Sequence, residues 1–211
     1  MIDVLHSDHA ERAQVIEYIK QTFRRVYAAE PNSFMPHFIR VSDHQRNYKA
    51  IIGYRDAEHQ QLFLETYFNE PIEDVLSSHI GEPVTRASIV EVGNLAEAKA
   101  GDARLAIIAA TAFLHTAGYR WVVFTGVSRL RNAFRRLGLE PQELVEADDS
   151  RLSEEERKAW GSFYSERPVV CFGDIRTGHD NLQDMWVSLR DTWASAVEEG
   201  EKFANNRDAH I

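Results

Sequence analysis

The sequence has few cysteines and prolines and no long apolar run, and each absence excludes a class of protein. Among 211 residues there is one cysteine, Cys171, so neither an intramolecular disulfide nor a CxxC-based zinc site can form. The longest apolar run extends from Leu105 to Leu114, about half of the 20 residues that span a bilayer. The N-terminal segment also lacks the basic and apolar regions of a secretory signal. We therefore expect a cytoplasmic protein without stable membrane insertion.

Positive charge is also scarce. The chain has 24 Lys and Arg against 33 Asp and Glu, a net charge of -9, which disfavours binding to nucleic acid or to an anionic lipid surface. Hydrophobic residues make up 44% of the chain and charged residues 27%, proportions typical of a globular domain. The length fits one domain, which we place at residues 1–178, followed by a C-terminal helix and tail at 179–211.

The first third of the chain predicts a helix and a hairpin. Apolar residues at spacings of three and four favour a helix over residues 9–28. Two runs rich in β-branched residues, 37–41 and 49–55, flank a polar turn and predict an antiparallel hairpin. Residues 62–68 fit a strand or a helix equally well, and Pro71 opens a short helix.

The centre of the chain predicts a βαβα unit. An apolar strand over 87–96 precedes a largely apolar helix, which begins near Ala103 and ends at Gly118. A second buried strand follows at 121–126, and a helix from Ser128 then ends at Gly138. This order predicts that the two strands lie side by side and parallel, with Val90 near Val123. A last strand is expected at 168–175.

The C-terminal segment carries one apolar helical stripe, whose members are Leu182, Met185, Trp186, Leu189, Trp193 and Val197. Such a stripe needs a partner. It packs either on its own domain or, as the alternative, on a second copy of the chain in a homodimer.

Glu91 is an acidic residue inside an otherwise apolar strand. Burial of a carboxylate is costly unless the group is paired or partly hydrated, so Glu91 indicates either a cleft or a salt bridge, with Arg86 or Arg40 as the partner. In a cleft, burial would raise the pKa of Glu91 toward the range of a general base.

Two basic segments are candidate anion sites. The loop before the helix at Ala103 offers backbone N–H groups to a phosphate, and its candidate ligands are Lys99, Gly101, Ala103 and Arg104. The same loop reads equally well as a plain helix cap. The helix from Ser128 carries four arginines that either are solvated or dock an anionic donor, namely Arg129, Arg131, Arg135 and Arg136.

Several short motifs together resemble the thermostable hemolysin family. They are LFLE at 62–65 with Tyr67, PIE at 71–73, Arg86 with IVEVGNLA at 89–96, WVVFT at 121–125, LR at 130–131, LGL at 137–139, WG at 160–161 and PVV at 168–170. That family is similar in turn to the GNAT acyltransferases, and especially to their acyl-homoserine-lactone synthase branch. The resemblance implies an α/β fold with a twisted mixed sheet, splayed between its fourth and fifth strands to admit an acyl thioester.

The resemblance also implies roles for individual residues. It makes Glu91 the general base and Asn94 the group that positions or polarises a substrate, with Leu95 and Thr125 lining the donor cleft. The acceptor side would include Arg24, Tyr27, Tyr54, Arg55, Glu65 and Tyr67. Three positions depart from the GNAT pattern: Ala98 replaces the first Gln or Arg of the phosphate loop, Asp102 adds a negative charge where phosphates would lie, and Phe134 replaces a tyrosine acid.

We therefore expect an acyltransferase that moves an acyl group from acyl-CoA or an acyl carrier protein to an amine-bearing small molecule. No tightly bound cofactor and no metal site are expected. Two alternatives remain open: a membrane-damaging hemolysin, as the family name says, and a non-catalytic protein that binds acyl thioesters.

Overall fold

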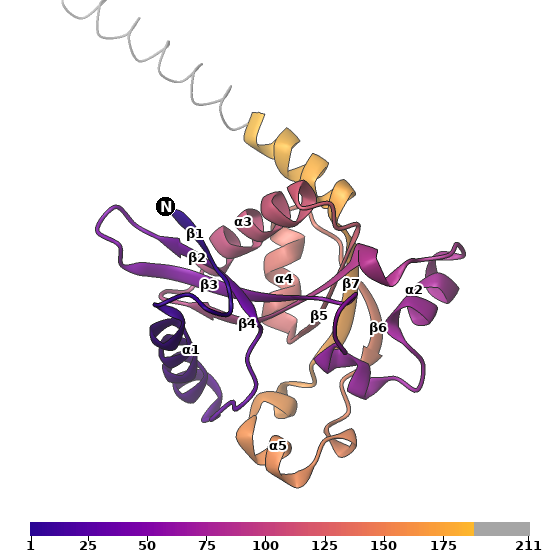
Figure 1. The fold of residues 1–211 in the computed structure, drawn as a ribbon, viewed down its shortest axis with the longest axis horizontal. Coiled ribbons are helices and arrows are strands. Elements are labelled where there is room, and N and C mark those ends of the chain that lie inside the picture. Colours follow the sequence, from indigo (N-terminus) through magenta and orange to yellow (C-terminus); the bar gives the residue numbers. More distant parts are fainter. Residues whose placement is uncertain (188–211) are drawn as a thin grey trace, which may run out of the picture.

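The computed structural model describes residues 1–187, which form a mixed α/β fold around a seven-stranded sheet (Figure 1). The strand order is β1-β2-β3-β4-β5-β7-β6, and every neighbouring pair is antiparallel except β4 and β5. The strands are β1 (Ile2–Leu5), β2 (His37–Ser42), β3 (Tyr48–Asp56), β4 (Ile89–Glu97), β5 (Trp121–Gly126), β6 (Gln142–Glu146) and β7 (Val169–Asp174).

The helices cover both faces of the sheet. Their bounds are α1 (Arg12–Tyr27), α2 (Ile72–Ile80), α3 (Ala103–Thr116), α4 (Ser128–Arg136) and α5 (Glu154–Ala159), with short 3₁₀ helices that include η1 (Phe63–Tyr67). The predicted helix and hairpin of the first third, the βαβα unit and the last strand are therefore confirmed. The ambiguous segment at 62–68 contains η1.

The parallel pair is the one that the sequence predicts. Val90 is opposite Val122, and Glu91 is opposite Val123. Helix α3 connects the two strands and ends at Thr116, two residues before the expected Gly118. The φ of Gly118 is +91°, in the left-handed region that glycine adopts without strain.

Three elements were not expected from the sequence. Strand β1 at the sheet edge is four residues long, β6 at the other edge is mostly polar and exposed, and α5 begins within the polar, acidic segment 146–156. Short or polar edge strands lack the alternation that marks a half-buried strand.

Alternate residues of the strands pack on opposite faces. Ile52 belongs to the core beneath α3 and α4, whereas its neighbour Ile51 belongs to the core beneath α1. Because α1 lies on one face and α3 and α4 lie on the other, an opening between two strands would connect both cores.

Residues 175–187 are helical, and Leu182 and Met185 pack against the core beneath α3. Trp186, also of the predicted stripe, is 60% exposed and lines a cavity. The remaining stripe residues, Leu189, Trp193 and Val197, lie outside the described residues. Within residues 1–187 no helix combines the length and the apolar composition that a membrane crossing requires.

Candidate active site

Strands β4 and β5 pair over only three positions and then separate. The last pair joins Glu91 to Val123; beyond it β4 follows β3 as far as Glu97, while β5 follows β7 as far as Gly126. The edge of β4 that faces β5 therefore has no strand partner after Glu91. The predicted split between the fourth and fifth strands is confirmed.

Strand β4 contains a β-bulge just beyond the last residue that pairs with β5. Between the pairs Gly53–Gly93 and Ile51–Ala96, β4 contains one more residue than β3. Asn94 lies in this bulge with a φ of +48°, a left-handed conformation that asparagine tolerates better than most residues. Its side-chain Oδ1 accepts a hydrogen bond of 2.8 Å from the backbone N–H of Met35. Asn94 thus ties the bulge to the backbone of Met35, and it lines the cavity described next.

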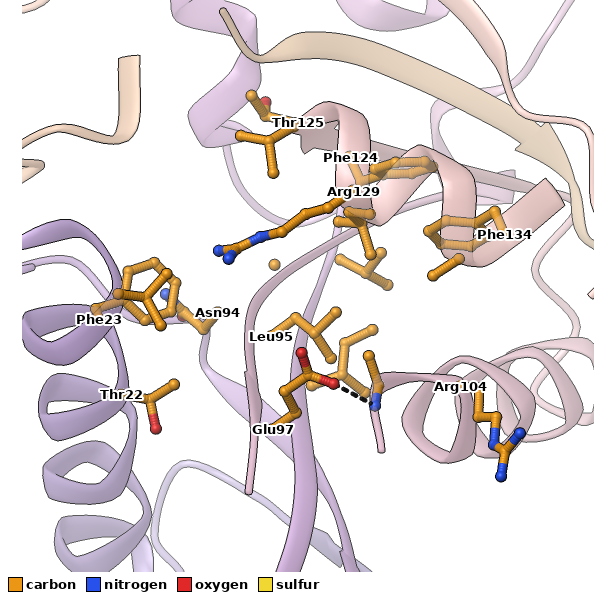
Figure 2. A pocket seen from close by; sticks show the side chains of 18 of the residues that line it. Thr22, Phe23, Asn94, Leu95, Glu97, Arg104, Phe124, Thr125, Arg129 and Phe134 are labelled. Carbon is orange, nitrogen blue, oxygen red and sulfur yellow. Dashed lines mark hydrogen bonds between the residues drawn. The ribbon is translucent and has the colours of Figure 1, made fainter. Parts of the chain in front are cut away.

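The split opens into a cavity of about 1160 Å³ that is lined from both faces of the sheet. Figure 2 shows the cavity between α1, α3 and α4, with the side chains of β4 and β5 directed into it. On the side of α3 and α4 the lining is aliphatic and aromatic: Leu95, Ile108, Phe124, Leu130, Phe134 and Leu137. On the side of α1 it is mainly aromatic: Phe23, Tyr27, Phe63, Tyr67, Trp160, Phe163 and Tyr164. The volume is slightly above the usual range for a single small ligand, roughly 300–1,000 Å³.

Glu91 lies where the two strands part, and it is 3% exposed. Its carboxylate accepts hydrogen bonds from the backbone N–H groups of Phe63, at 2.9 Å, and Leu64, at 3.1 Å, at the start of η1. Burial raises the pKa of Glu91 to about 7, against the opposite effects of these two donors and of the Arg55 charge.

No ion pair holds this carboxylate among the described residues. Arg86, one of the two predicted partners, binds Glu65 and Glu73. Arg40, the other, binds Asp3 and Glu11. The salt-bridge interpretation of Glu91 is therefore wrong, and Glu91 is a buried carboxylate that lines a cavity.

Two tyrosine hydroxyl groups lie on the α1 side of the cavity. Tyr67 and Tyr164 are hydrogen-bonded to each other through their hydroxyls. Burial raises the pKa of Tyr164 to about 12 and that of Tyr67 further, so both stay protonated at neutral pH. Tyr164 follows the WG motif, but no pattern in the sequence brings it next to Tyr67, which is 97 residues away.

The Arg129 side chain reaches across the cavity from α4 toward α1 (Figure 2). Its guanidinium donates a hydrogen bond to the Tyr27 hydroxyl and lies 4.8 Å from the centre of the Tyr27 ring. Phe134, on the next turns of α4, stacks on Phe124 at 4.7 Å, so α4 presents a ring without a hydroxyl to the cavity.

The start of α3 is occupied by a side chain of the protein itself. Oε2 of Glu97 accepts hydrogen bonds from the backbone N–H groups of Gly101, at 3.2 Å, and Ala103, at 2.9 Å. The dashed line in Figure 2 marks one of the two. Lys99 and Arg104 line the adjacent part of the cavity. The N–H groups that the sequence assigns to a phosphate thus have an internal partner, Glu97, which the sequence analysis missed.

Most of the predicted site residues line this one cavity: Tyr27, Arg55, Tyr67, Glu91, Asn94, Leu95, Lys99, Gly101, Ala103, Arg104, Thr125 and Arg129. The Oγ1 of Thr125 is buried and has no hydrogen-bond partner within residues 1–187.

Four predicted residues do not line it. Arg24 pairs with Glu30 on the surface, and Arg131 pairs with Glu143. Tyr54 packs between His37 and Phe113 in the core. Glu65 binds Arg86 and the backbone N–H groups of Leu62 and Ile72. These side chains are engaged elsewhere in the fold, which spacing along the sequence does not reveal.

In the described part of the chain, no three His, Cys, Asp or Glu residues are grouped to hold a metal ion. Cys171 is fully buried in β7, and burial raises the pKa of its thiol to about 12, so it has little thiolate character at neutral pH.

Comparison with protein families gives a match over most of the chain. The model of the family described as "Thermostable hemolysin" matches residues 5–179. No curated protein matches the sequence.

Among the solved structures similar to this chain are three synthases. One is FeeM, an N-acyl amino acid synthase from uncultured soil microbes, with a TM-score of 0.56 and 11% identity over 86% of this chain and 98% of FeeM. A second is the AHL synthase LasI, with a TM-score of 0.53 and 12% identity over 83% and 90% of the two chains. A third is BjaI, a CoA-dependent acyl-homoserine lactone synthase solved with SAM and isopentyl-CoA, with a TM-score of 0.53 and 13% identity over 88% of each chain. At these identities the likeness shows a shared fold.

Proposed function

This chain belongs to the thermostable hemolysin family, and from that premise we propose that it is an acyltransferase that moves an acyl group from a thioester to an amine-bearing small molecule. The observation that carries the proposal is the cavity that crosses the sheet at the split, with the buried carboxylate of Glu91 where the strands part. Membership of the fold shared by FeeM, LasI and BjaI supports it.

The unpaired edge of β4 suits the arm of a thioester donor. A pantetheine arm carries two amides, and an extended ligand with amides can pair with a free strand edge as an added strand would. After Glu91 this edge is open toward β5. The aliphatic side of the cavity, beneath α3 and α4, then receives the acyl chain by burial of apolar surface.

The α1 side of the cavity suits the acceptor. Its aromatic walls bury apolar groups, while Arg55, Arg129 and the hydroxyl pair of Tyr67 and Tyr164 supply hydrogen-bond donors. A donor and an acceptor that enter from opposite faces of the sheet would meet at the split, next to Glu91.

Glu91 acts as the general base in this proposal. It removes a proton from the amine, directly or through one water, as the nitrogen attacks the thioester carbonyl. The C–N bond forms, the tetrahedral intermediate collapses, and the C–S bond breaks to release the thiolate. Asn94 positions the donor, because its bond to Met35 holds the bulge of β4 just beyond the last pair with β5. Phe134 cannot protonate the thiolate, so we expect that proton to come from solvent or from another cavity group.

The test is thiol release. The purified protein is incubated with octanoyl-CoA or octanoyl carrier protein and pooled amines, while free thiol is followed and the N-acyl product is identified by mass spectrometry. Acyl transfer that depends on an amine is the expected result. Thermal stabilisation by the donor without turnover would instead identify a binding protein, and leakage of liposomes without turnover would identify a lytic protein.

A further inference from the structure

We propose that Glu97 selects the donor: it closes the helix terminus that a diphosphate would need, so that the protein uses a thioester on a phosphopantetheinyl carrier protein in preference to acyl-CoA. This inference rests on the proposed acyl transfer. It concerns a residue that is separate from the general base and lies at the donor entrance beside α3.

The backbone N–H groups at the start of α3 are already occupied. A helix N-terminus binds a phosphate through N–H groups that lack a partner within the helix. Here the N–H groups of Gly101 and Ala103 both donate to Oε2 of Glu97. A diphosphate can use these donors only after it displaces a carboxylate of the protein, and hydrogen bonds to a charged group are stronger than those to a neutral one.

Negative charge at the same helix terminus also disfavours a diphosphate. Asp102 stands at the N-terminal end of α3, and its Oδ2 is buried with no hydrogen-bond partner within the described residues. Together with Glu97 it places two carboxylates where the diphosphate of CoA would lie. A like charge at such short range disfavours an anion, and the interaction is screened little in a partly buried site.

Basic residues at the same entrance suit a carrier-protein donor. Lys99, Arg104 and Arg136 line the outer part of the same cavity and come from the β4–α3 loop, α3 and α4. In Figure 2 the Arg104 side chain points away from the Glu97 carboxylate. In a chain with a net charge of -9 these three cations form a local basic rim. Such a rim can pair with one phosphodiester and with the acidic surface of a carrier protein, and neither requires the N–H groups of α3.

The experiment compares the same octanoyl group on CoA and on a carrier protein, in wild type and in Glu97→Ala. We expect the wild type to favour the carrier, and Glu97→Ala to lower the KM for octanoyl-CoA about tenfold while the KM for the carrier changes less than about twofold. An equal change for both donors, or a wild type with the same KM for octanoyl-CoA as the variant, would overturn the inference.

Two further variants guard against a local effect on folding. Glu97→Gln keeps a carbonyl acceptor for the N–H groups but removes the charge. We therefore expect its KM for octanoyl-CoA to lie between those of the wild type and Glu97→Ala. Glu156 of α5 also accepts backbone and side-chain hydrogen bonds at a helix start, and it does not line the cavity. Glu156→Ala is therefore the matched control that should leave donor preference unchanged. If Glu156→Ala lowered the KM for octanoyl-CoA as much as Glu97→Ala does, the proposed role of Glu97 would be contradicted.

Binding of CoA gives a readout that does not depend on turnover. Free CoA should raise the thermal midpoint of Glu97→Ala and leave that of the wild type nearly unchanged. Equal stabilisation of both proteins would contradict the role of Glu97. Absence of transfer from either donor, with this difference in CoA binding intact, would refute the proposed acyl transfer and leave the selection of ligand by Glu97 standing.

Discussion

Glu65 and Glu91 are two buried carboxylates at η1, and they differ in one partner: Glu65 belongs to η1, and Glu91 of β4 binds the backbone of its first two residues. Both accept hydrogen bonds from backbone N–H groups. Glu65 also binds the guanidinium of Arg86, and its pKa is held below the ordinary value, whereas Glu91 has no ion pair and its pKa is raised to about 7. A guanidinium in contact keeps a buried carboxylate charged and structural. Without that contact, burial leaves the carboxylate able to exchange a proton near neutral pH.

The two regions around these residues differ in the same way. Glu65 lies in a closed network that joins Arg86 to Glu73 and to backbone groups near α2. Glu91 lies where strand pairing stops and a cavity begins. Four predictions test whether this contrast separates a structural site from a reactive one.

The largest expected effect is on the rate of acyl transfer. Glu91→Gln removes the proton acceptor while it keeps the size of the side chain, so kcat should fall by about 10²–10⁴-fold. The assay is thiol release with a saturating donor. An unchanged rate would show that Glu91 is not the base.

The second-largest expected effect is a loss of stability when Glu65 loses its ion pair. Arg86→Met leaves Glu65 buried without its cation, and the free energy of unfolding should fall by about 3 kcal/mol in denaturant titration. Arg24→Met is the matched control, because the Arg24–Glu30 pair is exposed and its loss should change stability little. Equal losses in the free energy of unfolding of Arg86→Met and Arg24→Met would contradict a special structural role for the Arg86–Glu65 pair.

The third effect is the dependence on pH. As a base Glu91 must be ionised, so kcat should rise about tenfold per pH unit below pH 7 and level off above it. The folded-state pKa of Glu91 lies above its ordinary value of 4.5, so between about pH 4.5 and 7 the folded protein binds more protons than the unfolded chain. The contribution of Glu91 to stability therefore decreases as pH rises through that window.

Comparison with Glu91→Gln isolates this contribution, because the variant lacks the titrating group. The wild type should lose stability relative to the variant from pH 4.5 to 7. Glu65 has the opposite sign: its lowered pKa gives stability that is present above its unfolded value and is lost as pH falls. A constant difference between wild type and Glu91→Gln would contradict the raised pKa.

The smallest effect concerns the contact across the cavity. Tyr27→Phe removes the hydroxyl that accepts the Arg129 hydrogen bond but keeps the ring beneath the guanidinium. We expect the KM for the amine to rise about threefold to tenfold with kcat nearly unchanged, since one hydrogen bond to a positioned cation is lost. A fall in kcat alone would place Arg129 in the chemical step.

Much of the fold could be predicted because the central segments are strongly apolar and bounded by glycine. Strand β5 was predicted at its observed bounds, and α3 and α4 begin within a residue of theirs. Strands β1 and β6 could not be found because short or polar edge strands carry no periodic signal.

The candidate site could be predicted only in part. Glu91 stands out because it is a charge within an apolar strand. The bond of Asn94 to Met35 joins residues 59 positions apart, and the Tyr67–Tyr164 pair joins residues still further apart, so neither follows from local spacing. Glu97 does precede Gly101 by four residues, but a lone carboxylate before a helix gives no sign of which N–H groups it will bind.

The most direct test is to titrate the two carboxylates in one sample. With ¹³C-labelled glutamate side chains, NMR follows each carboxyl group, and Glu91→Gln and Glu65→Gln assign the two resonances. We predict a midpoint near pH 7 for Glu91 and one below 4.5 for Glu65. If Glu91 instead titrates at or below 4.5, it is a stably charged structural group, and its role as the base is contradicted.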